Sequence, residues 1–335
     1  MAKRINLGFV GCGGHAVFHA DVVAKMPDMF NVVAAVDTNK DRAQTFLDKY
    51  AWQGVATDKV SNLSSRLVGG DGLDAAVICT PHNSHLELSQ TMVNAGVHVL
   101  CEKPLWEGIF DYEGRKVISD AKDRGLVFSS CHPRRFEPEY LYIKDNLPDF
   151  LHLYGSLVEI RFEFFYHEPS TGWKMEDSLL LDHMNHEIDL VRFLVGPSPA
   201  KFWRLSQSHD RYQVAGRTDY GLAIWFSGYR QLGTRVFRNE LELVFAKGRV
   251  RVESVLNSRT GMVASNVSSL SFEDGYEPPT LSFPTRQYDT SLSAIMYNFG
   301  AAILGEEPCY ISPEDLIVNS MICNQLRENE QASIP

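Results

Sequence analysis

The chain has 335 residues, 44% of them hydrophobic and 22% charged, with a net charge of −10. A chain of this length and ordinary composition can bury more than one core, so we expect a globular protein of two domains. The negative charge argues against a nucleic-acid partner, and no apolar run approaches the roughly 20 residues that span a bilayer.

The first residues and the cysteines indicate a cytoplasmic protein. The opening residues, M-A-K-R, lead directly into an apolar strand, without the hydrophobic core of a signal peptide. The six cysteines form no C-x-x-C pair and lie mostly within apolar strand or helix patterns. We interpret them as reduced, buried thiols, and not as disulfides or metal ligands.

Short apolar runs alternate with helical patterns from residue 5 to about residue 132. The predicted strands are 5–10, 32–36, 75–79, 97–101 and 126–129, and the predicted helices are 17–25, 40–50, 63–68, 86–95 and 112–124. The runs are brief and do not alternate in polarity, which is typical of strands buried on both faces. This order predicts an α/β domain with a doubly wound parallel sheet.

A glycine-rich turn follows the first predicted strand. Gly11 and Gly13 lack a Cβ, so the backbone can turn sharply and let a phosphate approach, and Ala16 is small enough for helix–strand packing. The helix that follows directs its unpaired N–H groups and the positive end of its dipole at the same place. Gly11, Gly13, Gly14 and His15 are therefore predicted to bind the phosphates of a dinucleotide.

Asp37 ends the second predicted strand, 21 residues after Ala16, at the spacing of a carboxylate that binds the adenosine ribose. A carboxylate there accepts hydrogen bonds from both hydroxyls and repels a 2′-phosphate, so NAD is predicted in preference to NADP. Lys40 and Arg42 lie close by and weaken that preference. The alternative is that Asp37 only caps the helix that begins after Asn39.

Two polar turns follow the predicted strands 75–79 and 97–101, C-T-P-H-N-S-H at 79–85 and L-C-E-K-P-L at 100–105. Ligands of doubly wound sheets bind at these carboxyl ends. We therefore predict cofactor contacts from Thr80, Pro81, His85, Glu102 and Lys103. A lysine considered alone is most often a surface residue, but an ammonium facing the nicotinamide can stabilise developing oxyanion charge.

The glycine turn, T-P-x-x-x-H at 80–85 and E-K-P at 102–104 together resemble the Gfo/Idh/MocA family, the relatives of glucose–fructose oxidoreductase and inositol dehydrogenase. The likeness runs nearly end to end, through R-F-x-P at 135–138, D-x-x-x-H-x-x-D at 182–189 and a closing helical segment at 313–328. The resemblance implies a dinucleotide-binding Rossmann domain at 1–131 and a substrate-binding and oligomerisation α+β domain at 132–335. It also implies a large open sheet whose outer face pairs subunits into a homodimer or homotetramer.

The residues after about 131 carry the pattern of a mostly antiparallel sheet. Residues 154–167 alternate between apolar and charged side chains, which predicts a long strand with one buried face. Further strands are predicted at 200–206, 219–226, 231–237, 241–246 and 249–252. Residues 256–289, rich in Ser, Thr, Asn and Pro, are predicted to form loops and short strands.

The segment 178–195 predicts an amphipathic helix on which Asp182, His186 and Asp189 share one face at i, i+4 and i+7. An imidazole titrates near neutral pH and suits proton transfer. The resemblance implies a Lys–Asp–His site in which Lys103 donates to the reacting oxygen, His186 is the general acid or base, and Asp182 binds a hydroxyl or orients His186. The alternative is that the two aspartates merely satisfy a buried histidine.

The substrate pocket is less well defined by the sequence. Arg135, Tyr166 and Trp173, with His167, are candidates to line a sugar pocket, although ordinary packing accounts for each equally well. The glycine-rich turn that many relatives carry before the aspartate is replaced by E-D-S-L-L-L at 176–181. Zinc is not predicted, because neither a thiolate cluster nor H-E-x-x-H accompanies the histidines.

The sequence thus predicts an NAD(P)-dependent dehydrogenase or reductase that transfers a hydride between nicotinamide and a secondary alcohol or ketone of a sugar, sugar derivative or cyclitol. Two alternatives remain: an enzyme with retained cofactor and net non-redox chemistry, and a catalytically silent NAD-binding regulator. An intact Lys103, Asp182 and His186 argue against the regulator.

Overall fold

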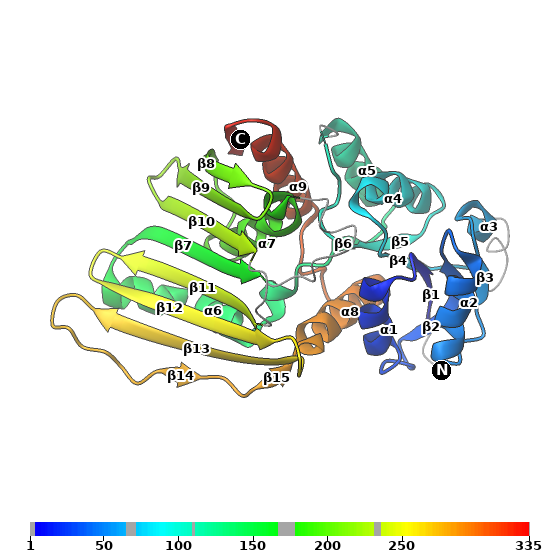
Figure 1. The fold of residues 1–335 in the computed structure, drawn as a ribbon, viewed down its shortest axis with the longest axis horizontal. Coiled ribbons are helices and arrows are strands. Elements are labelled where there is room, and N and C mark those ends of the chain that lie inside the picture. Colours follow the sequence, from blue (N-terminus) through cyan, green and yellow to red (C-terminus); the bar gives the residue numbers. More distant parts are fainter. Residues whose placement is uncertain (1–3, 65–71, 109–110, 167–177, 231–235, 335) are drawn as a thin grey trace. The chain divides into compact units, whose positions relative to one another are not determined.

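The computed structural model describes residues 4–64, 72–108, 111–166, 178–230 and 236–334. The chain forms two compact units, one of Met1–His132 with Leu292–Ile317 and one of Pro133–Ser291 with Val318–Pro335. Each unit has its own sheet (Figure 1). The sequence suggests a single boundary near residue 131, whereas the chain returns to the first unit over Leu292–Ile317.

The first unit contains a parallel sheet of six strands in the order β3-β2-β1-β4-β5-β6. β1 pairs in parallel with both β2 and β4. The chain therefore adds strands on one side of β1 up to β3 and on the other side from β4 onwards. The strands are short, and β1 and β4 are almost wholly buried, which confirms the parallel sheet predicted from unbroken apolar runs. Their bounds are β1 (Ile5–Val10), β2 (Phe30–Val36), β3 (Val55–Thr57), β4 (Ala75–Ile78), β5 (His98–Cys101) and β6 (Phe128–Ser130).

The helices of the first unit connect these strands. Asn39 is the N-cap of α2, and glycines with positive φ follow α4 and α5 at positions 96 and 125. Helix α8, which comes near the end of the sequence, packs on Met29 and Phe30 at the start of β2. The contact is close, because a Cβ added to Gly300 of α8 would lie 2.2 Å from Met29 Sδ. The bounds are α1 (Gly14–Val23), α2 (Lys40–Lys49), α3 (Ser61–Ser64), η1 (His82–Ser84), α4 (His85–Asn94), α5 (Asp111–Asp123) and α8 (Asp289–Leu304).

The second unit is built on a ten-stranded sheet in the order β14-β13-β12-β11-β7-β10-β9-β8-β16, with β15 paired to β13. Among the described strands of this sheet, only β7 and β10 pair in parallel. The predicted alternation in β7 is confirmed, with Phe162 buried and Arg161 exposed. The strands are β7 (Leu157–Tyr166), β8 (Ala200–Ser208), β9 (Arg211–Thr218), β10 (Ala223–Arg230), β11 (Val236–Phe245), β12 (Gly248–Asn257), β13 (Met262–Ser271), β14 (Leu281–Ser282), β15 (Arg286–Gln287) and β16 (Gln331–Ile334).

Helices cover one face of this sheet. Helix α6 (Pro138–Tyr154) packs on β12 and β13, and α7 (Leu179–Val195) packs on β9 and β10 (Figure 1). Ser178 caps α7 by accepting from the Leu181 N–H, and Gly196 ends it. The short η2 (Pro133–Phe136) precedes α6, and α9 (Pro313–Glu328) confirms the predicted closing helix. None of the described helices has both the length and the apolar character needed to cross a membrane.

Three predicted segments differ from the structure. The strand predicted at 219–226 is wrong at its start, because residues 219–222 form the turn between β9 and β10, with Gly221 at φ +97°. Helix α6 was missed because Pro148 interrupts its pattern, and β13 is one strand of 10 residues where the sequence suggested loops and short strands. Residues 231–235 of the strand predicted at 231–237 lie outside the described residues.

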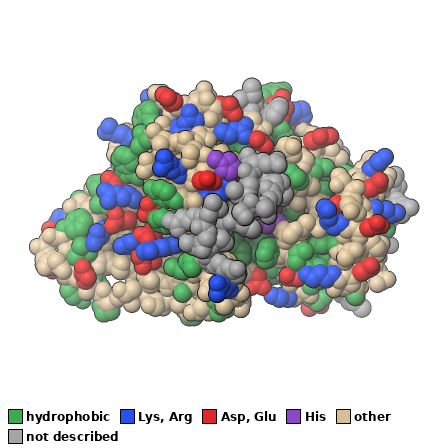
Figure 2. Space-filling view, in the orientation of Figure 1, with side chains coloured by type: hydrophobic (Ala, Val, Ile, Leu, Met, Phe, Trp, Pro, Cys, Tyr) green, Lys and Arg blue, Asp and Glu red, His purple; other side chains and the backbone are tan. Residues whose placement is uncertain are grey.

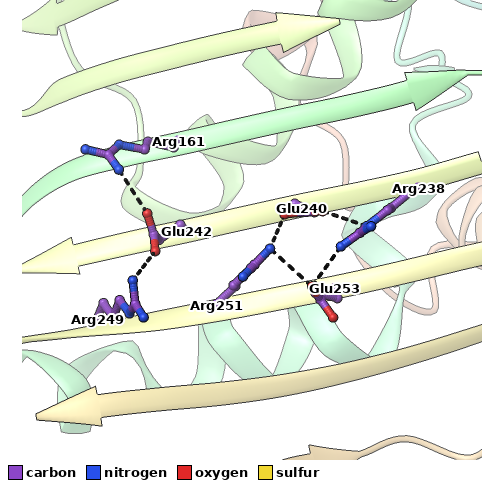
Figure 3. Close-up of polar contacts among 7 residues, drawn as sticks. All are labelled: Arg161, Arg238, Glu240, Glu242, Arg249, Arg251 and Glu253. Carbon is purple, nitrogen blue, oxygen red and sulfur yellow. Dashed lines mark hydrogen bonds and ion pairs between the residues drawn. The ribbon is translucent and has the colours of Figure 1, made fainter. Parts of the chain in front are cut away.

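The other face of the second unit's sheet carries charged side chains. Glu242 on β11 lies between Arg161 of β7 and Arg249 of β12, at 3.3 Å from each. A second group joins Glu240 and Glu253 to Arg238 and Arg251 (Figure 3). Figure 2 shows acidic and basic side chains interleaved over this part of the sheet. Exposed pairs of this kind contribute about 0–1 kcal/mol each, so they keep the face polar more than they stabilise the fold.

Two acidic residues at the start of α6 share one arginine. Arg286 of β15 lies 2.7 Å from Glu139 Oε1 and 3.7 Å from Glu137 Oε2. Burial, together with the charge of Glu139, raises the pKa of Glu137 above its usual value. The folded protein therefore keeps a proton on Glu137 at a pH where the unfolded chain releases it.

This raised pKa predicts a pH-dependent stability. The free energy of unfolding should fall as the pH rises from the unfolded value of 4.5 towards the raised value in the folded protein, by about 1.4 kcal/mol per pKa unit. Glu137→Gln should remove this part of the slope, because an amide does not titrate. Urea unfolding at a series of pH values measures it, with the exposed Glu314→Gln as control. An unchanged slope in Glu137→Gln would contradict the prediction.

Candidate active site

The turn after β1 is shaped by a close backbone contact. Gly11 has φ +86°, and a Cβ added there would lie 2.5 Å from the Cys79 carbonyl oxygen at the end of β4. Any other residue would be both strained and in collision with a backbone atom. The Gly11 N–H donates to the Val36 carbonyl at 2.8 Å, which ties the turn to the end of β2. The ends of three strands therefore meet at this glycine.

The amino-terminal end of α1 faces open space. A Cβ added to Gly13 or to Gly14 would meet nothing within 4 Å. Gly13 is the N-cap, and within the described chain no side chain caps α1 and no acidic residue lies in its first turn. Uncapped N–H groups at the positive end of a helix dipole attract an anion. The open space and the uncapped N–H groups are compatible with an anion at this turn, and phosphate binding by Gly11, Gly13, Gly14 and His15 stays a prediction.

Asp37 is held at the edge of this turn. Its Oδ2 accepts from the Cys12 N–H at 3.1 Å, its Oδ1 accepts from the Asn39 N–H at 2.9 Å, and it is 7% exposed. The alternative that Asp37 caps α2 is wrong, because the cap is Asn39, whose side chain accepts from the Arg42 N–H. The guanidinium of Arg42 lies 3.3 Å from Asp37, so a positive group stands beside the predicted ribose position.

His85 joins the two turns that follow β4 and β5. Its Nδ1 lies 2.7 Å from the Pro104 carbonyl oxygen and its Nε2 lies 2.8 Å from that of Thr80. Burial lowers the pKa of His85 to about 4, so the ring is neutral at pH 7 and donates to one carbonyl at a time. The ring is fully buried and holds the turn that carries Lys103 against the turn that carries Thr80.

Glu102 is paired with a histidine that the sequence analysis did not single out. His19 Nε2, on the buried side of α1, lies 2.8 Å from Glu102 Oε1. Burial alone would raise the pKa of Glu102, but the His19 hydrogen bond and the charges of His15, His19 and Lys103 hold it well below its usual range. The backbone N–H of Lys103 also points to this carboxylate, at 3.2 Å. The sequence signal that could have identified His19 is a polar residue on the buried side of α1, three positions after Ala16.

One cluster in the described part of the chain has donor atoms close enough for a metal. The ligand atoms of His19, Cys79 and Glu102 lie within 4.8 Å of one another. Burial raises the pKa of the Cys79 thiol well above its usual value, which favours the protonated thiol, a poor metal ligand. The Nε2 of His19 is already hydrogen-bonded to Glu102 Oε1. We assign no metal to this cluster.

In the second unit, α7 presents the predicted Asp–His–Asp stripe in a buried setting. Asp182 is 2% exposed, His186 is 9% exposed and Asp189 is 1% exposed. Asp189 accepts two hydrogen bonds from Arg135, at 2.7 and 2.8 Å, and a third from Asn319 of α9 at 2.8 Å. The last aspartate of the stripe is therefore held by an arginine and an amide, and it does not serve only to satisfy His186.

Two of the predicted substrate residues are described. Arg135 is 4% exposed and uses both Nε and a terminal nitrogen on Asp189, so this geometry gives no support to a substrate contact. Tyr166 is 9% exposed and packs its ring against Phe164, His183 and Phe237. Trp173 and His167, the other two candidates, lie outside the described residues.

Comparison with known proteins matches both halves of the chain to one group. Residues 5–131 match the family GFO_IDH_MocA, described as an oxidoreductase family with an NAD-binding Rossmann fold. The chain is 24% identical over 332 residues to inositol 2-dehydrogenase of Rhizobium meliloti, covering 92% of this chain and 91% of that protein. It is 27% identical over 200 residues to 4-carboxy-2-hydroxymuconate-6-semialdehyde dehydrogenase of a Sphingobium species, covering 57% of this chain and 59% of that protein.

A solved structure supports the fold over nearly the full length. The scyllo-inositol dehydrogenase of Lactobacillus casei, crystallised with NAD(H) and scyllo-inositol, has a TM-score of 0.75 and covers 99% of each chain at 19% identity. An identity this low shows the fold alone. The match of residues 5–131 to the family model and a relative that spans both units support a Gfo/Idh/MocA family oxidoreductase with an NAD-binding Rossmann fold in its first unit.

Proposed function

We propose that this protein is an NAD-dependent oxidoreductase that transfers a hydride between nicotinamide and a secondary alcohol or ketone of a sugar, sugar derivative or cyclitol. The observation that carries the proposal is the buried stripe of α7, where a carboxylate and an imidazole lie one helical turn apart. The inositol dehydrogenase relatives, which match over both units, support the substrate class.

The chain's own residues take three roles in this proposal. His186 holds the hydroxyl proton as general base, or returns it to a ketone oxygen as general acid. Lys103 donates to the reacting oxygen, and Asp182 binds a neighbouring hydroxyl or orients His186. NAD, when bound, supplies the hydride acceptor or donor, and Gly11, Gly13 and His15 hold its phosphates. Thr80, Pro81, His85 and Glu102 shape the turns at the nicotinamide end.

NAD is proposed over NADP because of Asp37. Its carboxylate is oriented by two backbone N–H groups and repels a 2′-phosphate. Arg42 favours NADP instead, since its guanidinium lies beside Asp37 and its side chain is 56% exposed. The carboxylate is the better placed of the two, because it is buried and fixed by the backbone whereas the arginine is held by a single side-chain contact.

Gly11→Ala should abolish tight cofactor binding. The added Cβ meets the Cys79 carbonyl oxygen at 2.5 Å, so the turn must move away from its phosphate-binding shape. We expect the Kd for NAD to rise by about 100-fold, or about 3 kcal/mol, as measured by calorimetry or fluorescence. Gly96→Ala is the matched control, because Gly96 also has a positive φ but a Cβ there meets nothing within 4 Å. Equal losses in both variants would contradict the steric argument.

Turnover tests the reaction itself. Purified protein is mixed with NAD or NADP and a panel of sugars, inositols, nucleotide sugars and semialdehydes, and reduced cofactor is followed by its absorbance. We expect oxidation of a polyol with NAD, and a fall in kcat of about 10²- to 10⁴-fold in His186→Gln. His152→Gln, an exposed histidine of the same unit, should leave turnover unchanged. Normal turnover in His186→Gln would overturn the role of His186.

The alternatives give different results in the same assay. Tight NAD binding without turnover on any substrate favours the silent regulator. A protein that purifies with nicotinamide bound, and converts substrate without net change in absorbance, favours retained-cofactor chemistry. Turnover restricted to semialdehydes would move the substrate class towards that of the Sphingobium relative.

We also propose that the outer face of the second sheet pairs subunits into a homodimer or homotetramer. The face carries Trp225, 42% exposed, and a stacked pair of Phe165 and Tyr229 at 5.3 Å, beside the ion pairs of β11 and β12. Aromatic residues ringed by charge are enriched at protein interfaces. The six cysteines, all within the described residues, form no disulfide bond, which fits the proposed action in the reducing cytoplasm.

Trp225→Asp should therefore weaken the assembly, because it places a charge in the centre of the proposed interface. Light scattering after size-exclusion chromatography is expected to show an oligomer for the unmodified chain and a monomer for the variant. Tyr112→Asp, an exposed aromatic residue of α5 in the first unit, is the control and should leave the mass unchanged. A monomeric unmodified protein at micromolar concentration would refute the pairing.

A further inference from the structure

A buried group of ionisable side chains lies beside His186 within the second unit. It contains His183 and Glu187 of α7, Tyr212 of β9 and Arg134 of η2. The sequence alone singles out none of the four as functional. Each of the four is at most 9% exposed. The proposed reaction uses none of the four directly, although all four are buried near the histidine that is proposed to transfer the proton.

Glu187 is the centre of this group. It is fully buried, and its Oε2 accepts from the Tyr212 hydroxyl at 2.7 Å. Its Oε1 accepts no hydrogen bond from any described residue, and faces Arg134 at 3.6 Å and His183 Nδ1 at 3.9 Å. One carboxylate oxygen is thus fixed, whereas the other faces two nitrogen groups just beyond hydrogen-bond distance. A buried carboxylate oxygen in this setting favours a proton or a cation nearby.

The ring of His183 is fixed between aromatic groups. It stacks on Phe164 of β7, with ring centroids 3.6 Å apart and planes at 20°, and Tyr166 lies at 5.3 Å. The guanidinium of Arg134 lies over the rings of Phe162 and Phe164, at 4.6 and 5.4 Å. These contacts leave the His183 ring little freedom to turn away from its neighbours.

His183 is also a direct neighbour of His186, with ring centroids 5.1 Å apart. Two imidazoles at this separation do not readily carry a positive charge together, so a proton on one disfavours a proton on the other. Burial raises the pKa of Glu187 to about 7, although Arg134 and Tyr212 oppose the shift. A proton gained or lost by one of these three neighbouring groups therefore changes the proton affinity of the other two.

Further ionisable groups of the described residues lie near this cluster, including Asp189 of α7, which is paired with Arg135. On α7 itself, Asp182 lies one turn before His186. Tyr166 comes from β7, and Cys323 of α9 lies near Tyr212. Burial and the charge of Glu187 raise the pKa of Tyr212 well above its usual value, so it stays a hydrogen-bond donor. Among the described residues that face Glu187, Arg134 supplies the permanent positive charge.

We propose that His183 and Glu187 act as positioning residues for His186: Glu187, held by Tyr212 and Arg134, attracts a proton to His183, and that charge keeps His186 neutral and ready to accept the substrate's hydroxyl proton. The inference rests on the proposed role of His186 as general base. It assigns the two residues no contact with substrate. Their effect passes through the charge of the ring beside His186.

The test measures the protonation of His186 directly. Protein labelled with ¹³C at the histidine ring is titrated by NMR without substrate, and the His186 signal is assigned by its loss in His186→Gln. His183→Phe keeps the aromatic contact with Phe164 and removes the titratable ring. Glu187→Gln keeps an acceptor for Tyr212 and removes the charge. We expect the midpoint of His186 to rise by about one pH unit in each variant. His152→Gln should leave it unchanged.

A turnover assay supplies the second readout. The acidic limb of kcat/KM should move to higher pH by the same amount as the NMR midpoint, with little change in KM. An unmoved midpoint in folded His183→Phe overturns the proposal, even if kcat falls, because a merely structural role would lower activity without shifting the titration. The NMR result stands whether or not the protein turns over a polyol, so failure of the proposed function is recognised separately. If Glu187→Gln does not fold, the NMR midpoint of His186 in His183→Phe alone decides whether the proposal stands.

Discussion

Each unit of this protein depends on the pairing of ionisable groups that its fold removes from water. An isolated charge in the interior costs several kcal/mol, and loss of one partner from a buried pair costs about 3–5 kcal/mol. In the first unit Glu102 is paired with His19 across 83 residues of sequence. In the second unit the adjacent arginines of η2 face two carboxylates of α7, Arg134 towards Glu187 and Arg135 towards Asp189. These pairs fix the helices that carry the candidate chemistry.

The two arginines show how geometry separates similar residues. Arg135 makes a bidentate pair with Asp189 at 2.7 and 2.8 Å, the arrangement that gives both strength and orientation. Arg134 stays 3.6 Å from Glu187 and spreads its guanidinium over aromatic rings instead. The first carboxylate is fully neutralised, whereas the second keeps one oxygen available. A fixed aspartate and an adjustable glutamate therefore lie two positions apart on one helix, on either side of Ile188.

The cofactor side of the protein relies on backbone geometry more than on side chains. At Gly11 three strand ends come together because a Cβ is absent, and His85 then holds the two neighbouring turns by their carbonyl oxygens. Contacts made by backbone groups change little when side chains vary, which suits the proposed role of this turn in binding a dinucleotide. The α7 stripe, by contrast, is built from side chains, with Asp182, His186 and Asp189 all buried.

The sequence by itself determined the parallel sheet, the glycine turn, Asp37 and the Asp182–His186 spacing. Each of these is encoded locally, by an unbroken apolar run, a missing Cβ or a helical period of 3.6 residues. Tertiary structure decided the rest. The pairing of His19 with Glu102, of Arg135 with Asp189, and of Tyr212 with Glu187 joins residues 83, 54 and 25 positions apart, and no local pattern reveals such partners. The return of Leu292–Ile317 to the first unit has the same origin, because helix α8 is placed by packing on Met29 and Phe30 and not by its own sequence.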